Sequence, residues 1–203
     1  GWLDSMLSSL NSDETIGVVG PTTNNISGIQ KIPVTYNQDT LNGLEEFANE
    51  IKQKNEGKKK KVLRLVGFAL LCKRSVLEEI GLFDERFGIG NYEDDDLCLR
   101  ALEKGYSLYI TLDAFVHHFG SVTFNESKVN YQEIIRQNKK VIIEKWKFNI
   151  DYFMFPRFEV ASLVPPTVKR VLEIGCGMGA MAIELKEKYN CEVTGIELDE
   201  NAV

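Results

Sequence analysis

Four acidic residues follow one another from Glu93 to Asp96, directly after a glycine-rich segment, Gly88–Tyr92. At the start of a helix, such carboxylates can simply accept free backbone N–H groups and favour the positive end of the helix dipole. On that interpretation all four would be surface carboxylates. The loop before the run and the pair His117-His118 at a later strand end favour another interpretation, a metal or acid–base site. Only one of the two histidines can face that site, because side chains alternate along a strand.

A second chemically suggestive segment is the glycine-rich turn Gly175–Gly179, which follows an apolar strand and opens a helix. Glycines there allow a ligand to approach the backbone closely at the helix N-terminus. Glu173 stands directly before the turn, and Glu197 ends the next strand, where an acid can accept hydrogen bonds from ribose hydroxyls. Gly175, Gly177 and Ala180 also fit the dinucleotide-binding pattern. A third interpretation is that this turn has a purely structural role.

The elements that would position these residues are predicted from hydrophobic periodicity and from glycine and proline. Gly81 and Gly105 suit the ends of two of the helices. Residues 56–61 (EGKKKK) are predicted to be a solvated loop, and Gly20-Pro21 to end the first strand. Helices are expected at 2–10, 44–56, 74–80, 94–104 and roughly 127–147, and strands at 16–19, 62–66, 68–71, 106–110 and 114–118.

A second unit is predicted to begin after residue 166, since aromatic residues and prolines over 153–166 are typical of a linker. The strand 170–174, the helix 180–188 and the strand 192–196 form one βαβ motif. The fold class predicted for the whole chain is therefore α/β. A single βαβ motif cannot bury its apolar faces alone, so we expect the chain to be truncated at its C-terminus.

The composition excludes several functional classes. The 203 residues carry a net charge of −6, so a nucleic-acid partner is not expected, because phosphate binding needs concentrated positive charge. No apolar stretch reaches about 18 residues, so no transmembrane segment is expected. The start of the chain has no signal-peptide pattern. The four cysteines are widely spaced, which favours reduced thiols in a cytoplasmic protein over a zinc site.

Several segments resemble, in the right order, family 2 glycosyltransferases of the GT-A fold. They match that family's sequence motifs "G-FDE-F" and "ED-D-L--R". They also match its motif of a strand that ends in His and Gly-Ser. The resemblance covers residues 1 to about 150. Its segments are Gly1–Leu3, Gly17–Pro21, Val66–Leu71, Phe83–Phe87, Tyr92–Arg100, Gly105-Tyr106, His118–Ser121, Asn138 and Lys145-Trp146.

The resemblance implies a partial GT-A domain, Rossmann-like with a mixed sheet, over residues 1–152. It implies inverting transfer from a nucleotide-sugar donor to a hydroxyl of a glycan or lipid-linked saccharide acceptor. Asp94 matches the general base, Glu93 its neighbour, and His118 a residue that helps to hold a divalent metal, Mg or Mn. Surface polysaccharide synthesis in the cytoplasm, at the inner face of the membrane, would suit this activity.

One departure from the family is large, because no DxD motif precedes Gly1. The nucleotide-binding half of the domain is missing from the sequence. We therefore expect this chain alone to be inactive and its metal site to lack ligands. Asp96 and Arg100 lie four residues apart on the expected helix and are predicted to form a structural ion pair.

Residues 167–203 resemble the start of a class I S-adenosylmethionine-dependent methyltransferase, with an incomplete Rossmann-like βαβ. The resemblance implies that Glu173, Gly175, Gly177, Gly179 and Glu197 bind S-adenosylmethionine. The favoured hypothesis is a glycosyltransferase fused to a methyltransferase. Two alternatives stay open: the methyltransferase is the main activity and the first part an accessory glycan-binding module, or the chain is a non-catalytic module that binds a glycan or a protein partner.

Overall fold

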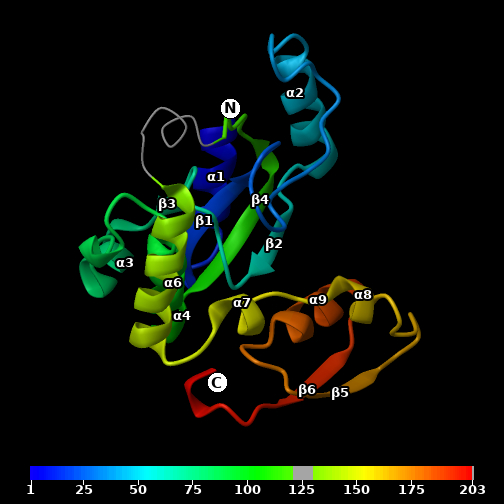
Figure 1. Cartoon of the computed structure of the whole chain (residues 1–203). Helices are drawn as coiled ribbons and strands as arrows, with labels where there is room; N and C mark the ends of the chain where they lie inside the picture. The colour runs from blue at the N-terminus through cyan, green and yellow to red at the C-terminus, as the bar shows by residue number, and fades with distance from the viewer. Residues whose placement is uncertain (121–129, 203) are drawn as a thin grey trace. The chain divides into compact units, whose positions relative to one another are not determined.

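The computed structural model describes residues 1–120 and 130–202 (Figure 1). The chain divides into two compact units, Gly1–Ile135 and Arg136–Val203. Each unit has its own sheet, with four strands in the first unit and two in the second. The chain is thus a mixed α/β protein, as predicted.

The first unit is built on a mixed sheet with the strand order β2-β4-β1-β3. The strands are β1 (Ile16–Thr22), β2 (Lys59–Val62), β3 (Leu71–Cys72) and β4 (Ser107–Phe115). The two central strands, β1 and β4, are parallel, and each outer strand pairs antiparallel with its neighbour. The sheet therefore has two edges, and one of them is the lysine-rich strand β2.

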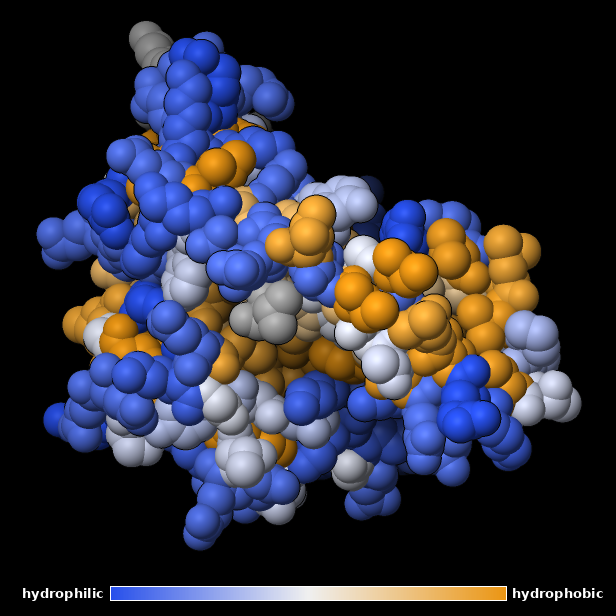
Figure 2. Space-filling view, turned by 90° about the horizontal axis from the view of Figure 1, so that it is seen from below, coloured by the Kyte–Doolittle hydropathy of each residue, from blue (hydrophilic) through white to orange (hydrophobic). Residues whose placement is uncertain are grey.

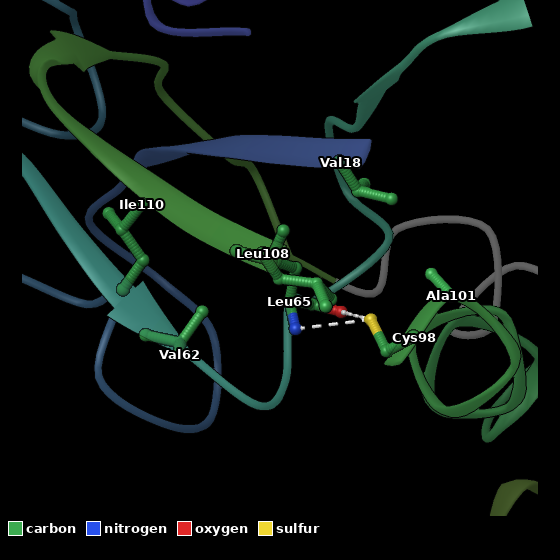
Figure 3. Packing of buried hydrophobic residues seen from close by; sticks show 7 residues of the cluster. All are labelled: Val18, Val62, Leu65, Cys98, Ala101, Leu108 and Ile110. Atoms are coloured by element: carbon green, nitrogen blue, oxygen red, sulfur yellow. Dashed lines mark hydrogen bonds between the residues drawn. The ribbon is translucent and has the colours of Figure 1, made fainter. Parts of the chain in front are cut away.

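Helices cover both faces of this sheet. Helices α1 (Trp2–Asn11) and α4 (Glu93–Glu103) pack into two different apolar clusters, one containing Val19 and the other Val18. Successive residues of a strand point to opposite faces, so the two helices lie on opposite sides of β1. Figure 3 shows the α4 side, where Cys98 and Ala101 face Leu65 and Leu108.

The predicted helices of this unit are confirmed within one or two residues. Besides α1 and α4, they are α2 (Leu44–Asn55) and α3 (Arg74–Ile80), followed by a 3-10 turn, η1 (Glu85–Phe87). Gly81 and Gly105 end α3 and α4 with φ of 83° each. The long helix, α6 (Tyr131–Trp146), belongs to both units, and residues 127–129 of its predicted range lie outside the described residues.

All five strand predictions for this unit are wrong in their limits. β1 continues through Gly20-Pro21 to Thr22, and β4 is one strand instead of two. Lys59–Lys61 belong to β2, whose outer edge faces no further strand, so lysines are tolerated there. Residues 63–70 form a loop, not two strands. Leu63 and Leu65 are apolar because this loop is buried against the core.

The second unit contains the predicted parallel βαβ motif, β5 (Arg170–Ile174), α9 (Ala180–Tyr189) and β6 (Glu192–Ile196). Two short helices, α7 (Ile150–Phe153) and α8 (Phe158–Ala161), precede it, and a 3-10 turn, η2 (Glu200–Ala202), follows it. One face of the sheet packs on α8 and α9 through residues such as Ala161, Met181 and Leu185.

The other face of this small sheet is exposed, with apolar residues such as Ile174 at its surface. Figure 2 shows apolar residues gathered on the surface that it draws. Parallel sheets are normally covered on both faces, so this one leaves apolar surface in water. Within the described residues, no helix combines the length and apolar character needed to cross a membrane.

Replacing Leu108 by alanine should destabilise the first unit strongly. Leu108 is fully buried in the central strand β4, within the cluster of Figure 3. The free energy of unfolding should fall by about 2–5 kcal/mol, because truncation leaves a cavity in a packed core. Urea denaturation followed by circular dichroism measures this fall. The exposed Leu82 provides the control: Leu82→Ala should change the value by no more than about 0.5 kcal/mol.

Candidate functional site

The acidic run forms the first turn of α4, and most of it is buried. Asp94, Asp95 and Asp96 are only 6%, 1% and 0% exposed, and the N-cap residue, Tyr92, forms no side-chain capping bond. These three acids are therefore not surface carboxylates as the capping interpretation expected, although Asp94 does accept a free backbone N–H group of this turn. The two residues before the run, Asn91 and Tyr92, have φ of 73° and 75°. Residues other than glycine adopt this left-handed backbone conformation only at an energetic cost. Residues with such strained conformations are found often at functional turns.

Asp94 is fixed by two backbone N–H groups. Gly67 donates from its amide to Oδ2 at 2.7 Å, and the amide of Asp95 donates to Oδ1 at 2.9 Å. A Cβ atom on Gly67 would lie 3.1 Å from that of Asp94, so glycine allows the loop to approach this closely. These bonds fix the position of the carboxylate.

The next two acids are bound by arginines. Arg64 forms an ion pair with Asp95; burial alone would lower the pKa of Arg64, but the charge of Asp95 more than offsets this and raises it. Arg100 donates to Asp96 at 2.8 Å, as predicted, and also to the carbonyls of Ile80 and Leu82. Both acids therefore have structural roles, which link α4 to the loops before it.

Glu93 differs from its three neighbours. It is half-buried, and its Oε2 atom is shielded from solvent without a hydrogen-bond partner. Burial, and after it the negative charge of Asp94, raises the pKa of Glu93. The start of α4 thus carries one tightly bound carboxylate and, beside it, one unsatisfied carboxyl group that retains its proton to a higher pH than usual.

His118 follows the end of β4 and is held by neighbouring asparagines. Its backbone N–H donates to the side chain of Asn24 at 2.8 Å, and its Nδ1 lies 2.6 Å from the carbonyl oxygen of Asn25. A carbonyl oxygen only accepts, so Nδ1 carries the hydrogen. A neutral His118 therefore has its lone pair on Nε2. The ring also contacts Phe68, with 5.4 Å between centroids.

Asp94 and His118 are linked through one segment of the loop 63–70. Gly67 bonds Asp94, and the next residue, Phe68, packs against His118. His117 instead contacts Tyr36 through Nδ1, and burial followed by the charge of His118 lowers its pKa. Ser121, the last residue of the predicted His-Gly-Ser segment, lies outside the described residues.

The expected divalent metal is not supported by the residues around His118. The described part of the chain contains no group of three or more His, Cys, Asp or Glu residues arranged to hold a metal. Nε2 of His118 could supply one ligand, but Mg and Mn require several oxygen ligands. The described residues do not form a metal site.

One residue of this region was not singled out by the sequence. Gln30 is almost fully buried, and its amide connects two segments: Nε2 donates to the carbonyl of Pro21 at 2.9 Å, and Oε1 accepts from the amide of Val66 at 2.8 Å. This residue holds the loop 63–70 at the end of β1. It lies in a stretch rich in polar loop residues, and nothing in its spacing indicates burial.

The glycine-rich turn of the second unit borders a cavity of about 350 Å³. Gly175, Gly177 and Gly179 all have left-handed φ angles, which glycine adopts without strain. The cavity is lined by Glu173, Gly175 and Gly177 and by aromatic residues of the segment 151–156. Its volume is within the usual range for small-ligand sites.

The two acids that flank the turn behave differently. Glu173 lines the cavity, its Oε2 is buried without a hydrogen-bond partner, and burial raises its pKa, although Arg157 acts in the opposite direction. Glu197 accepts hydrogen bonds from the amides of Gly177, Leu198 and Asp199. Its carboxylate therefore stabilises the turn, and its contact with a ribose stays a prediction.

The turn packs closely on the segment 151–156. Gly177 leaves no room for a side chain, because a Cβ atom would lie 2.8 Å from the ring of Phe153. Aromatic residues of that segment line the cavity together with Glu173, whose buried Oε2 has no hydrogen-bond partner among the described residues.

Comparisons with known proteins give short, partial matches. An uncharacterized protein of Haemophilus influenzae is 49% identical over 35 residues, 17% of this chain and 14% of that protein. Uncharacterized proteins of Mycobacterium bovis and Mycobacterium tuberculosis are each 40% identical over 70 residues, 32% of this chain and 26% of their own. The chain thus spans about a quarter or less of the length of these curated relatives. No protein-family model matches it.

Replacing Arg64 by methionine should destabilise the first unit by about 3 kcal/mol, because the buried Asp95 then lacks its counter-charge. Chemical denaturation at pH 7 measures the difference. The double variant Arg64→Met/Asp95→Leu should recover at least half of the loss. As control, the exposed pair Arg74–Glu78 should contribute little, so that Arg74→Met changes stability by less than about 0.5 kcal/mol. If Arg64→Met and Arg74→Met changed the free energy of unfolding equally, the structural role of Asp95 would be refuted.

Glu197 should titrate at a lower pH than an ordinary glutamate. Hydrogen bonds from the amides of Asp199, Gly177 and Leu198 lower its pKa. Since the folded pKa is depressed, the stabilisation is complete above the unfolded value of about 4.3 and is lost as the pH falls through the folded pKa. In an NMR titration the amide signal of Gly177 should shift with a midpoint below 4.3. Glu197→Gln should abolish that step, and a midpoint at or above the ordinary value would contradict the assignment.

Proposed function

We propose that the first unit is the acceptor-activating part of an inverting glycosyltransferase of family 2. The observation that carries this proposal is the arrangement at the start of α4. Asp94 is buried and held by the amide of Gly67, while Glu93 stands beside it with an unsatisfied oxygen. A stable fold does not need an unpaired acid next to a buried carboxylate, and such arrangements are common at sites of proton transfer.

In the proposed reaction Asp94 accepts the proton of an acceptor hydroxyl. The hydroxyl oxygen forms a bond to the anomeric carbon of the donor sugar, and the bond between that carbon and the nucleoside diphosphate breaks with inversion. The diphosphate leaves with the bonding electrons. Asp94 is suited to this role because its two amide hydrogen bonds fix the carboxylate in one position at the start of α4.

His118 is the proposed contact to the donor side of the reaction. Its Nε2 atom carries a lone pair when the ring is neutral, because Nδ1 donates to Asn25. The divalent metal of the family would offset charge on the diphosphate. The described residues supply too few ligands to hold this metal.

A second function is proposed for the second unit, the binding of S-adenosylmethionine by the start of a methyltransferase fold. The cavity beside the glycine-rich turn, with the unsatisfied Glu173, favours it. The cofactor would supply an activated methyl group, while Glu173 and the glycines Gly175 and Gly177 would hold it. A chain with both functions would suit the assembly of a methylated surface glycan in the cytoplasm, at the inner face of the membrane.

Asp94→Asn should reduce sugar transfer by at least about 1,000-fold, because an amide cannot accept the proton. The protein should remain folded, since the amide oxygen can still accept from Gly67. Transfer is measured in the product of the complete reading frame, with a panel of nucleotide-sugars and saccharide acceptors. Glu103→Gln, at the exposed other end of α4, is the matched control and should be as active as the wild type.

The variant Glu93→Gln, tested in the same assay, distinguishes a role of Glu93 in sugar transfer from a role in protein stability. It should reduce transfer by at least about tenfold, yet stabilise the protein at pH 7 by about 0.5 kcal/mol, because it removes a poorly satisfied carboxylate. Wild-type transfer by Asp94→Asn would refute the proposed base. A large loss of stability in Glu93→Gln would show that Glu93 is a structural residue.

A further inference from the structure

Positive charge is concentrated in one short segment of the first unit, at the end of α2 and along β2. This lysine segment, residues 52–61, contains six of the 24 Lys and Arg residues of the chain but only one of its 30 acids. The rest of the chain is therefore more negative than the net charge of −6 indicates. Such a separation of charge gives one part of an acidic protein a local positive potential.

The fold holds the lysine segment on ordered structure at an edge of the sheet. Helix α2 leads through residues 56–58 directly into the edge strand β2 (Figure 1). Lys54 and Lys58 are exposed, and Nζ of Lys58 donates to the carbonyl of Lys54 at 2.9 Å. Lys59 donates to the side chain of Ser12 and lies over the ring of Tyr109. These contacts hold several ammonium groups close together.

The acids Asp4, Asp13 and Asp113 adjoin the lysine segment, and each of them accepts hydrogen bonds from other groups. Asp113 is buried and accepts from the amide of Gly57 at 3.1 Å. Asp13 accepts from a backbone amide two residues further on at 2.8 Å, and Asp4 from the ammonium group of Gly1. These acids therefore offset only part of the charge of the six lysines.

Helix α1, next to the lysine segment, adds exposed apolar side chains. Serines of α1 line a small hollow of about 70 Å³ together with Lys58 and Lys59. The same helix exposes Trp2, Leu3 and Leu7, and the two leucines are one turn apart. Exposed Trp and Leu beside lysines are typical of proteins that lie on a membrane surface.

The composition of the lysine segment favours a membrane over a nucleic acid. The segment contains no arginine and no aromatic residue. Nucleic acids are commonly bound through the paired donors of a guanidinium and through bases that stack on aromatic rings. A lysine ammonium is instead a point charge on a flexible stem, which suits a diffuse anionic surface.

We propose that the lysine segment and the exposed side of α1 bind the surface of a membrane that contains anionic lipids. The ammonium groups attract the phosphates of the lipid headgroups, and Trp2, Leu3 and Leu7 enter the boundary between headgroups and acyl chains. This binding is independent of the proposed sugar transfer, so that either can fail without the other.

The lysine segment is also close to the candidate site along the chain. Lys59 pairs with Thr111 of β4, and His118 follows Thr111 by seven residues. Seven extended residues span at most about 25 Å. A membrane bound at the lysine segment would therefore present its lipid-linked molecules within reach of the first unit.

Flotation of the 203-residue chain with lipid vesicles tests the binding. Vesicles of phosphatidylcholine mixed with phosphatidylglycerol should bind the protein at least roughly tenfold more tightly than vesicles of phosphatidylcholine alone, because each lysine near an anionic surface contributes about fivefold. Raising the salt concentration from about 0.1 M to about 1 M should weaken the binding, since the Debye length falls from about 10 Å to about 3 Å.

Lys54→Gln/Lys58→Gln should reduce the affinity for the anionic vesicles by at least about tenfold, because two exposed charges are lost. Lys54→Arg/Lys58→Arg keeps the charge and should bind like the wild type. The matched control is Lys186→Gln/Lys188→Gln, which removes two exposed charges from α9 and should stay within about twofold of the wild type.

Leu3→Gln/Leu7→Gln should also weaken the binding to the anionic vesicles, and at high salt as well as at low salt, because salt does not screen apolar contact. Unchanged binding by this variant would overturn the part of the proposal that concerns α1.

Equal binding of the wild type to both kinds of vesicle would overturn the proposal, and so would equal losses in Lys54→Gln/Lys58→Gln and in the α9 control. A single-stranded RNA oligonucleotide is the competing probe. If the wild type bound the RNA but not the anionic vesicles, the lysine segment would be a nucleic-acid surface instead. Thermal unfolding curves that match the wild type exclude misfolding of a variant as the cause of a loss.

Discussion

The first turn of α4 places three buried carboxylates in the interior of the first unit, and the loop 63–70 compensates two of them, while Arg100 of α4 compensates Asp96. A buried charge without a partner costs several kcal/mol. Arg64 supplies a counter-charge to Asp95, and Gly67 supplies an amide to Asp94. Between these two contacts Leu65 packs on Cys98, as Figure 3 shows. The loop is therefore held by charge, hydrogen bonding and apolar contact at once.

The candidate site depends on the same loop. Phe68 packs on His118, and Val66 is bonded to the buried Gln30, which in turn holds the end of β1. Loss of the charge compensation under α4 would thus also move the residues next to His118. The turn before α4 keeps two left-handed residues, Asn91 and Tyr92, although glycine at those positions would avoid the strain. Strain at this place supports a functional role for the turn.

The sequence predicts the helices well because their periodicity and their terminal glycines are local. Strand limits depend on tertiary contacts and are predicted less well. The polar residues Thr111 and Asp113 interrupt the apolar pattern of the sequence, yet both are buried in β4, where Asp113 accepts from the amide of Gly57. Burial of the acidic run could not be predicted either, since Arg64 is 31 residues away from Asp95 in the chain. The sequence predicts the position of the acidic run, but not the contacts that compensate its buried charges.

The two units use acids in the same physical way. In each, one carboxylate accepts from the amide of a glycine, Asp94 from Gly67 and Glu197 from Gly177. In each, a second acid close by is left with a buried, unsatisfied oxygen, Glu93 in one unit and Glu173 in the other, and burial raises the pKa of both. The satisfied acids fix a loop or turn, which explains them by stability alone. The unsatisfied acids lower stability, which supports the proposal that they receive a ligand or a proton.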